Sequence, residues 1–415
     1  MSEDRKTSIV NNNAERISRR GFMAGAGAAA LSLTVAGPQI ARSAGEKVNL
    51  GLIGCGGRGT WIAELFKQHG GYNLAAVADY FQDRADNAGE KLGVPAANRF
   101  TGLSGYKKLL EKVDAVAIES PPYFHPMQAA DAVEAGLHVY LAKPIAVDAP
   151  GCRSVADSGK RAAQNKRCFL VDFQTRADEF FIEALKRVRD GALGDFVFGE
   201  ALYHADCPFK RMYDAWRSAP DDSENRLRAW GLDRVLSGDI ITEQNIHTLD
   251  VMSWIMDAEP VSAVGTCGRA IRPVGTCNDH FALLFEYPNK VAITFSSKQF
   301  DGYGTQPDGI RNRMFGSKGV LETSYGDLTM IRGQNLYRGG RSPGIYKDGA
   351  VANIATFHKN IVEGKFENPT VAPSVRSNLV TVLGRTAAYT GRKVTWKEVA
   401  ESTEKLDANL KGVKA

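Results

Sequence analysis

The sequence lacks any long apolar run, any internal repeat and any strong excess of one charge over its main part. Beyond residue 44, no stretch is long and apolar enough to span a membrane, so we expect no membrane segment in the mature protein. The formal charge is +5, and residues 1–44 hold six basic and three acidic side chains, which leaves about +2 for the remainder. Such a balance gives no basis for nucleic-acid binding.

Residues 1–44 are typical of a cleavable export signal. A basic region with Arg19 and Arg20 precedes a short stretch rich in alanine and glycine, and small residues follow near position 44. The arginine pair with Phe22 resembles a twin-arginine signal, and a disordered tail that happens to contain the pair is the alternative. We therefore expect a periplasmic or secreted protein. Because this route exports folded proteins, we also expect a cofactor that is held tightly and regenerated in the site.

Cysteine is scarce and irregularly spaced. No metal-ligand spacing connects the six cysteines, so we predict no metal site: Cys55, Cys152, Cys168, Cys207, Cys267 and Cys277. A disulfide between Cys267 and Cys277 across adjacent strands is one reading. Buried free thiols are favoured, because folding before export takes place in a reducing compartment.

A glycine-rich loop follows the first predicted strand, over residues 47–53, and precedes a helix. Gly54, Gly56 and Gly59 fill the pattern G-x-G-x-x-G. The first glycine permits a tight turn, the second lets a pyrophosphate approach the backbone, and the third lets helix and strand pack closely. We assign the whole loop to dinucleotide binding: Gly54, Gly56, Gly57, Arg58 and Gly59.

An acidic residue ends the second predicted strand, over residues 74–79. Asp79 stands 20 residues after Gly59, where a carboxylate accepts both ribose hydroxyls of NAD and repels a ribose phosphate. We therefore predict NAD as the cofactor. Arg84 nearby leaves NADP open, and the non-functional reading of Asp79 is a helix N-cap.

The alternation of strands and helices continues to residue 173 and indicates a doubly wound parallel sheet with its ligand at the carboxyl ends of the strands. The further elements are strands at 115–119, 137–141 and 168–173 and helices at 126–135 and 151–165. Lys143, fixed by Pro144, follows one of these strands, so its ammonium group is expected beside the nicotinamide ring. Ser120, Pro121 and His125 follow another strand and are expected near the cofactor.

The pattern changes after residue 173. A helix at 180–190 precedes strands at 196–204, 280–286, 291–299 and 319–323 and helices at 355–363 and 375–389. We predict an α/β fold in which an N-terminal Rossmann domain is followed by a C-terminal α/β domain with a large open, mostly antiparallel sheet. The expected divisions are a signal peptide at 1–44, a dinucleotide-binding domain at 45–172, a substrate and oligomerisation domain at 173–350, and helices at 351–415 that return to the first domain.

Two stretches of the second domain hold candidate substrate-binding residues. Arg228 and Trp230, in a polar loop at 207–236, are suited to gripping sugar hydroxyls and stacking on a sugar, although a loop packed by its aromatic residues is an equal reading. Glu243 and His247 are four residues apart, so on a helix they share one face, with Asp250 placed to orient the imidazole. With Lys143 they form the predicted acid–base set.

Taken together, these motifs resemble the Gfo/Idh/MocA family of glucose–fructose oxidoreductases and inositol dehydrogenases over about residues 46–400. The family's Glu-Lys-Pro falls on Ala142-Lys143-Pro144 and its Asp-x-Gly-x-His falls on residues 243–247, so the lysine and histidine match while both acids differ. Phe173-Gln174 with Arg176 is a further match. The resemblance implies dimers or tetramers formed through the open sheet, Gln174 near the cofactor, and Arg176 near the substrate.

The main hypothesis is an NAD(P)-dependent oxidoreductase that acts on a secondary hydroxyl of a sugar, glycoside or polyol, with Lys143, His247 and Glu243 as catalytic residues. The first alternative is an NAD-dependent glycoside hydrolase that works by oxidation, elimination, addition and reduction. The second is a non-catalytic sugar-binding protein with structural NAD. Retention of both the lysine and the histidine disfavours this last reading.

Overall fold

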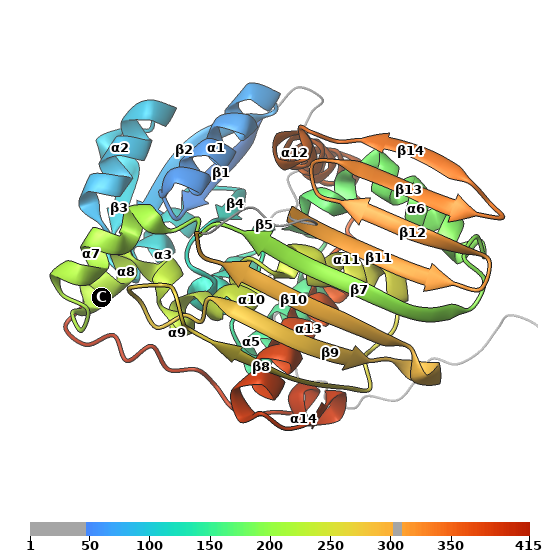
Figure 1. Ribbon diagram of the computed structural model, residues 1–415. Coiled ribbons are helices and arrows are strands. Elements are labelled where there is room, and N and C mark those ends of the chain that lie inside the picture. The colour runs from blue at the N-terminus through green and yellow to red at the C-terminus, as the bar shows by residue number, and fades with distance from the viewer. Residues whose placement is uncertain (1–46, 302–308) are drawn as a thin grey trace, which may run out of the picture. The chain divides into compact units, whose positions relative to one another are not determined.

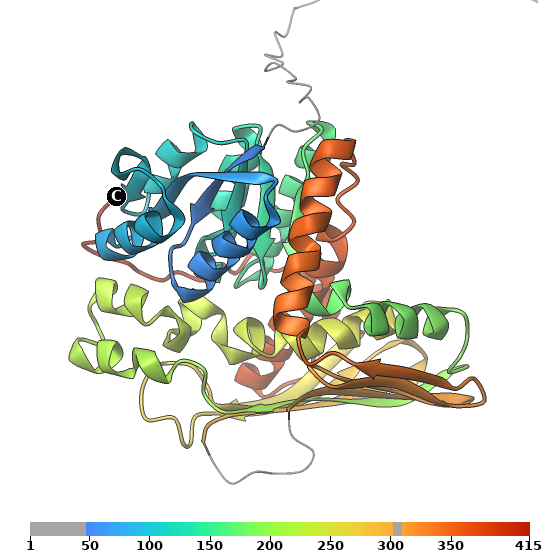
Figure 2. The ribbon, with the colours of Figure 1, turned by 90° about the horizontal axis from the view of Figure 1, so that it is seen from above.

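The computed structural model describes residues 47–301 and 309–415, so the predicted export signal lies outside the described residues. The described chain forms two sheets with helices between and around them (Figures 1 and 2). This arrangement confirms the predicted fold class.

The first sheet is the parallel, doubly wound sheet that the alternating pattern predicts. Its six strands run in the order β3-β2-β1-β4-β5-β6: β1 (Val48–Ile53), β2 (Tyr72–Asp79), β3 (Arg99–Thr101), β4 (Ala115–Ile118), β5 (His138–Ala142) and β6 (Phe169–Asp172). The helices between them are α1 (Gly57–His69), α2 (Gln82–Leu92), α3 (Gly105–Leu110), α4 (His125–Glu134) and α5 (Ala149–Gln164). The strand order reverses between β1 and β4, and ligands of such sheets bind at this reversal.

The second sheet has nine strands in the order β14-β13-β12-β11-β7-β10-β9-β8-β15, and its paired strands are antiparallel except for β7 and β10. The strands are β7 (Phe196–Ala205), β8 (Ser262–Gly268), β9 (His280–Glu286), β10 (Ala292–Gln299), β11 (Gly309–Gly316), β12 (Gly319–Ser324), β13 (Leu328–Gly333), β14 (Tyr337–Arg341) and β15 (Val394–Thr395). Buried and exposed residues alternate along β9 and β10, so this sheet buries one face.

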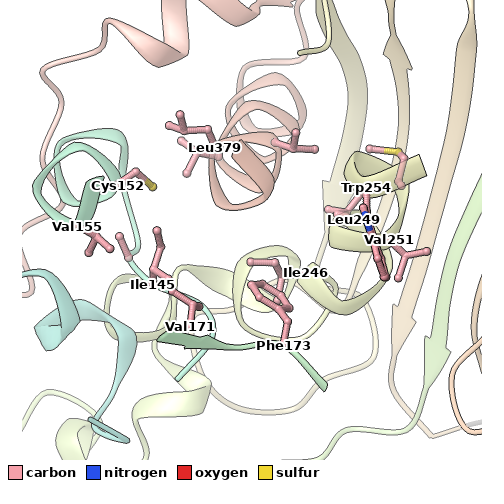
Figure 3. Packing of buried hydrophobic residues seen from close by; sticks show 14 of the residues in the cluster. Ile145, Cys152, Val155, Val171, Phe173, Ile246, Leu249, Val251, Trp254 and Leu379 are labelled. Atoms are coloured by element: carbon pink, nitrogen blue, oxygen red, sulfur yellow. The ribbon is translucent and has the colours of Figure 1, made fainter. Parts of the chain in front are cut away.

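Helices α6 (Glu179–Arg189), α11 (Ile246–Met256) and α13 (Val371–Thr390) pack on the buried face of the nine-stranded sheet (Figure 2). Residues 246–255 of α11 are all buried, because the helix lies inside the molecule. Figure 3 shows the core in this region, where Val155 of α5, Ile246 of α11 and Leu379 of α13 belong to one apolar cluster. The cluster joins the dinucleotide-binding sheet to the second sheet.

Helix α12 (Ile345–Glu363) begins ten residues before the helix predicted at 355–363 and packs against α1 and β6. It inserts Phe357 into an aromatic cluster of the first domain. The ring of Phe357 lies 5.7 Å from Tyr140, 6.4 Å from Phe66 and 6.5 Å from Tyr72. Helix α12 therefore belongs to the packing of the dinucleotide-binding sheet.

The stretch at 207–236, read from the sequence as a polar loop, is a packed set of short helices: α7 (Tyr213–Ser218), α8 (Ser223–Arg228) and α9 (Arg234–Ser237). Phe209, Trp216 and Leu232 form a small apolar cluster within it. This cluster agrees with the reading of a loop packed by its aromatic residues. Helix α10 (Asp239–Glu243) follows, and α14 (Trp396–Ala400) comes near the end of the described chain.

The six cysteines are free thiols, and all but Cys267 are buried. Within residues 47–301 and 309–415, no group of three or more His, Cys, Asp or Glu side chains is arranged to hold a metal ion. The helices of these same ranges are all too short or too polar to cross a membrane.

Replacing Phe357 with alanine should lower the free energy of unfolding by about 3–5 kcal/mol, because it leaves a cavity between α12 and the first domain. Chemical denaturation measures this change. The control is Val362→Ala on the same helix, where the side chain is 61% exposed and the change should stay within about 0.5 kcal/mol. Equal effects of the two substitutions would contradict the packing described for α12.

Candidate active site

The glycine loop is built so that part of its backbone stays open. Gly54 has φ 97°, and an added Cβ there would lie 2.5 Å from the Ser120 nitrogen, while a Cβ on Gly59 would lie 1.9 Å from the Gly54 oxygen. These two glycines are required by the fold. A Cβ on Gly56 or Gly57 would meet nothing within 4 Å. The open backbone at the N-terminus of α1 suits a pyrophosphate.

Asp79 connects this loop to the end of β2. Its carboxylate accepts hydrogen bonds from the backbone N–H of Cys55 at 2.8 Å and of Phe81 at 3.0 Å. Phe81, not Asp79, is the N-cap residue of α2, and no side chain caps this helix, so the reading of Asp79 as a helix N-cap is wrong. Burial raises the pKa of Asp79 above its usual value, and the donated backbone hydrogen bonds oppose that rise.

A cleft opens beside Asp79, and its empty space amounts to about 530 Å³ when the open solvent at its mouth is included. Gly54, Ser120 and Pro121, all predicted cofactor contacts, line it together with Asp79. Phe81, Phe124 and Leu227 supply apolar walls. An open glycine loop, a carboxylate and an apolar cleft fit the pyrophosphate, ribose and adenine of NAD, so we assign this cleft to the adenosine end of the site. Lys143 and His247 do not line this cleft.

Lys143 follows β5, and its ammonium group is buried against the second domain. Its Nζ donates to the main-chain oxygen of Glu243 at 2.7 Å and lies 3.4 Å from the Oε1 of the same residue. The two side chains are only 7% and 9% exposed. Burial lowers the pKa of Lys143, the Glu243 carboxylate opposes this, and the positive charge of Arg58 adds to the lowering.

His247 lies in α11 and is also buried, at 8% exposure. Burial lowers the pKa of its imidazole well below 6.5, and the positive charges of Lys143 and Arg58 lower it further. Its Nδ1 is buried without a hydrogen-bond partner among the described residues, and its ring lies 5.4 Å from that of Tyr325. A neutral imidazole with an unused nitrogen is able to accept a proton from a ligand.

The prediction that Glu243 and His247 share one face of a helix is wrong, because the two residues lie in different helices. Helix α10 ends at Glu243 and α11 starts at Ile246, with the N–H groups of Gln244 and Asn245 both donating to the Ile240 oxygen. Tertiary packing, rather than helical spacing, brings these two side chains into the environment of Lys143.

Asp250 does not orient His247, contrary to the sequence prediction. Its buried carboxylate accepts from the Nε of Arg176 at 3.0 and 3.1 Å and from its Nη2 at 2.9 Å. The guanidinium of Arg176 also lies 5.1 Å from the ring of Trp254. Arg176, predicted to bind substrate, is thus held in a buried ion pair within the second domain.

Arg228 and Trp230, also predicted to bind substrate, lie behind the wall of the adenosine cleft, since neither lines it but both pack against residues of the apolar cluster that forms the wall. Arg228 pairs with Asp83 of α2 at 3.0 and 3.1 Å and stacks 3.9 Å from the ring of Phe81. Trp230 packs 5.6 Å from Phe209. The sequence shows that both side chains are suited to a sugar, but it does not show which domain they face.

His125 holds two strand-end loops in place. Its ring nitrogens lie 2.7 Å from the main-chain oxygens of Ser120 and Pro144. Burial lowers the pKa of His125 to about 4, so the ring is neutral and only one of these contacts is a donated hydrogen bond. Asn378 of α13 fixes the same segment, since its Oδ1 accepts from the Ile145 N–H at 3.1 Å. His125 thus positions the loop that holds Lys143.

An ion-pair cluster around Arg58 was not predicted. Its Nη2 donates to Asp172 at 2.5 Å, its Nε lies 3.1 Å from Glu119, and its Nη1 donates to the Tyr346 hydroxyl at 3.0 Å. Burial raises the pKa of Glu119 to about 7. Gln174, a predicted cofactor contact, donates to Asp172 at 3.1 Å. The only sequence signal was their position at the carboxyl ends of buried parallel strands: Glu119 directly follows β4, and Asp172 ends β6.

The fold and the site define an NAD-binding oxidoreductase, and comparison with known proteins agrees. Residues 48–173 match the family model described as "Oxidoreductase family, NAD-binding Rossmann fold". Residues 181–322 match the "GFO/IDH/MocA C-terminal domain". The chain belongs to the Gfo/Idh/MocA family.

Curated relatives include an alpha-N-acetylgalactosaminidase from Shewanella oneidensis, 32% identical over 165 residues, which cover 38% of this chain and 35% of that protein. The match therefore spans about a third of the relative's length. Among solved structures, myo-inositol 2-dehydrogenase from Lactobacillus plantarum has a TM-score of 0.66 and 22% identity, covering 84% of this chain and 99% of that one. An aldose-aldose oxidoreductase from Caulobacter crescentus has a TM-score of 0.66 and 21% identity, covering 84% and 100%. These structures share the fold.

Replacing Gly56 with alanine should weaken NAD binding by about tenfold or more, about 1.4 kcal/mol, while leaving stability unchanged. The new methyl group meets no protein atom but enters the space in which a pyrophosphate approaches the backbone. Calorimetric titration and thermal unfolding measure the two quantities. In contrast, Gly59→Ala should lower stability, because its Cβ clashes with the Gly54 oxygen. Undiminished NAD binding by a folded Gly56→Ala protein would contradict the assigned pyrophosphate position.

Proposed function

We propose that the protein is an NAD-dependent oxidoreductase that acts on a secondary hydroxyl of a sugar, glycoside or polyol. The proposal rests mainly on the ammonium group of Lys143, which is buried and lies 2.7 Å from the main-chain oxygen of Glu243. Its positive charge helps to lower the pKa of the buried imidazole of His247. Burial leaves His247 neutral and able to take a proton, and the Glu243 carboxylate favours the protonated form of Lys143, an arrangement that suits the oxidation of an alcohol. Membership of the oxidoreductase family supports the redox chemistry.

When bound, the nicotinamide supplies a hydride acceptor and donor. The protein's part is to handle the proton and the oxygen. His247 accepts the hydroxyl proton, a role that typically contributes about 10²–10⁴-fold to the rate. Lys143 donates a hydrogen bond to the same oxygen and stabilises the negative charge that develops on it. Glu243 holds the ammonium group in place and binds a second hydroxyl.

The location and the fate of the cofactor are part of the same proposal. The twin-arginine-like leader favours a periplasmic or secreted enzyme, loaded with NAD before export. An enzyme without access to free NAD has to regenerate its cofactor in place, by oxidising one sugar and reducing another or by a redox-neutral cycle. The likeness in fold to an aldose-aldose oxidoreductase is consistent with the first route.

Glycoside hydrolysis is the second candidate, because the curated relatives include an alpha-N-acetylgalactosaminidase. Transient oxidation of a sugar hydroxyl acidifies the neighbouring C–H bond, and this permits elimination of the glycosidic substituent, addition of water and final reduction. The two candidates share their first step and so use the same Lys143 and His247. Release of the aryl alcohol from aryl glycosides without added NAD identifies the hydrolase, and oxidation products without such release identify the oxidoreductase.

A homodimer or homotetramer formed through the nine-stranded sheet completes the proposal. The exposed face of the sheet presents Phe198, Val264 and Leu284, which are 44%, 38% and 39% exposed. Phe198 stacks on Phe315 across β7 and β11 at 4.4 Å. Such an apolar face suits an interface between copies of the chain.

Lys143→Ala should nearly abolish turnover, and His247→Asn should lower kcat by about 10²–10⁴-fold, while both variants keep their affinity for NAD. The reason is that both side chains act on the substrate oxygen rather than on the adenosine half of the cofactor. Steady-state kinetics with an active sugar and titration with NAD measure the two effects. Lys160→Ala, at a lysine 74% exposed, is the control and should match the unmodified protein. Full turnover by Lys143→Ala would remove the assignment.

The pH dependence of kcat/KM should be bell-shaped. His247 has to be neutral, and its pKa is lowered well below 6.5, so activity should fall only as the pH drops below that value. Lys143 has to be protonated, and its pKa is lowered from 10.5, so activity should fall again before pH 10.5 is reached.

In Glu243→Gln the alkaline limb should move to lower pH, because the carboxylate that raises the pKa of Lys143 is gone. The acid limb should stay where it is, because burial, Lys143 and Arg58 are what lower the pKa of His247. An alkaline limb that moves to higher pH in this variant would contradict the pairing of Glu243 with Lys143.

A further inference from the structure

Residues 401–415 form an extended segment that runs from α14 to the dinucleotide-binding domain, seen in Figure 1 as the red trace that ends at the label C. Hydrogen bonds fix it at both ends. Arg153 of α5 donates to the Ser402 oxygen at 2.7 Å, and the Leu406 N–H donates to Asp148 at 2.9 Å. At the far end, the Leu103 N–H donates to the Lys414 oxygen at 3.1 Å. We call residues 403–415 the strap.

From residue 406 to residue 411 of the strap, more buried and exposed residues alternate. Ala408 is buried at 1% exposure, and Leu410 and Val413 are partly buried, whereas Asn409 and Lys411 are exposed. The inward residues join one apolar cluster with residues of both domains. An extended segment without strand pairing is held mainly by such contacts.

The cluster under the strap is also the wall of the adenosine cleft. Five residues belong to both the apolar cluster and the lining of the cleft: Tyr80, Phe81, Leu103, Phe124 and Leu227. These side chains line the space assigned to adenosine and belong to the same apolar cluster as Ala408, Leu410 and Val413. A movement of the wall therefore disturbs the packing of the strap.

Tyr80 joins the strap to helix α8. Its hydroxyl accepts a hydrogen bond from the Lys414 N–H at 3.0 Å and donates one to Glu224 at 2.6 Å. Glu224 and Leu227 both lie on α8, and Arg228 of the same helix pairs with Asp83 of α2. Two segments that are distant in sequence thus support the wall of the adenosine cleft: α8, which adds Leu227 to the lining, and the strap, which belongs to the apolar cluster behind it.

We propose that the strap is a retention device for the dinucleotide, and that undocking of its inward residues limits cofactor release. The inference rests on the proposed function, because it requires NAD in the cleft. It supplies a structural reason why an enzyme without access to free NAD keeps the molecule with which it was loaded. Coupling of this kind is reciprocal, so bound NAD in turn stabilises the docked strap.

The test compares two variants of the full chain, one with substitutions at inward residues of the strap and one with a substitution at an outward residue. Leu410→Ser with Val413→Ser removes inward apolar contacts, and Lys411→Ser changes an outward residue between them. The NAD-loaded proteins are mixed with excess reduced cofactor, and the dissociation rate of NAD is measured. We expect the inward variant to release NAD at least about tenfold faster, which is about 1.4 kcal/mol of barrier height. The dissociation rate of Lys411→Ser should equal that of the unmodified protein. At saturating NAD, the kcat of both variants should also equal that of the unmodified protein.

Equal dissociation rates in the unmodified protein and both variants would overturn the proposed role of the strap in retaining NAD, while leaving the proposed function intact. Failure of the unmodified protein to bind NAD at all would overturn both. Hydrogen exchange provides a second measurement that needs no variant. Adding NAD to the unmodified protein should slow exchange of the Leu103 and Lys414 N–H groups, and unchanged exchange there with NAD bound would also overturn the strap.

Discussion

The structure depends above all on one buried charge, the ammonium group of Lys143. Its hydrogen bond to the Glu243 oxygen joins residues 100 positions apart and connects β5 of the dinucleotide-binding sheet to α10 of the second domain. A buried cation is costly unless it is paired and hydrogen-bonded, so its surroundings have to be held rigidly. His125 and Asn378 do this by fixing the backbone that follows Lys143.

The same burial gives two neighbouring groups opposite roles. It lowers the pKa values of both Lys143 and His247, but the Glu243 carboxylate offsets the effect at the lysine, whereas nearby positive charges reinforce it at the histidine. The histidine is therefore left neutral near neutral pH, while the lysine has a carboxylate partner that favours its protonated form. Pairs of titratable groups whose environments push their pKa values apart are characteristic of acid–base sites. The Arg58 cluster, with Glu119 and Asp172, extends this charged environment to the glycine loop.

Features that depend on a short stretch of the chain could be predicted from the sequence. The glycine loop, Asp79 and Lys143 all follow buried strands, and parallel topology brings strand ends together, so the spacing along the chain was sufficient. Partners that are distant in sequence were not predictable in this way. Nothing near Arg176 indicated Asp250 as its partner, and nothing near Arg228 indicated Asp83. The break after Glu243 was hidden because its flanking segments are both apolar and helical. The packing of the strap on Tyr80 likewise depends on contacts between opposite ends of the chain.

The central claim is that a sugar hydroxyl is oxidised between Lys143 and His247 beside bound NAD. The most direct measurement is the absorbance of the bound nicotinamide when NAD-loaded protein is mixed, one by one, with a panel of sugars, glycosides and polyols. The account predicts that at least one of them reduces the bound cofactor in a single turnover. If every compound leaves the bound NAD oxidised, including any that bind, the protein is a sugar-binding protein with structural NAD and the redox account is wrong.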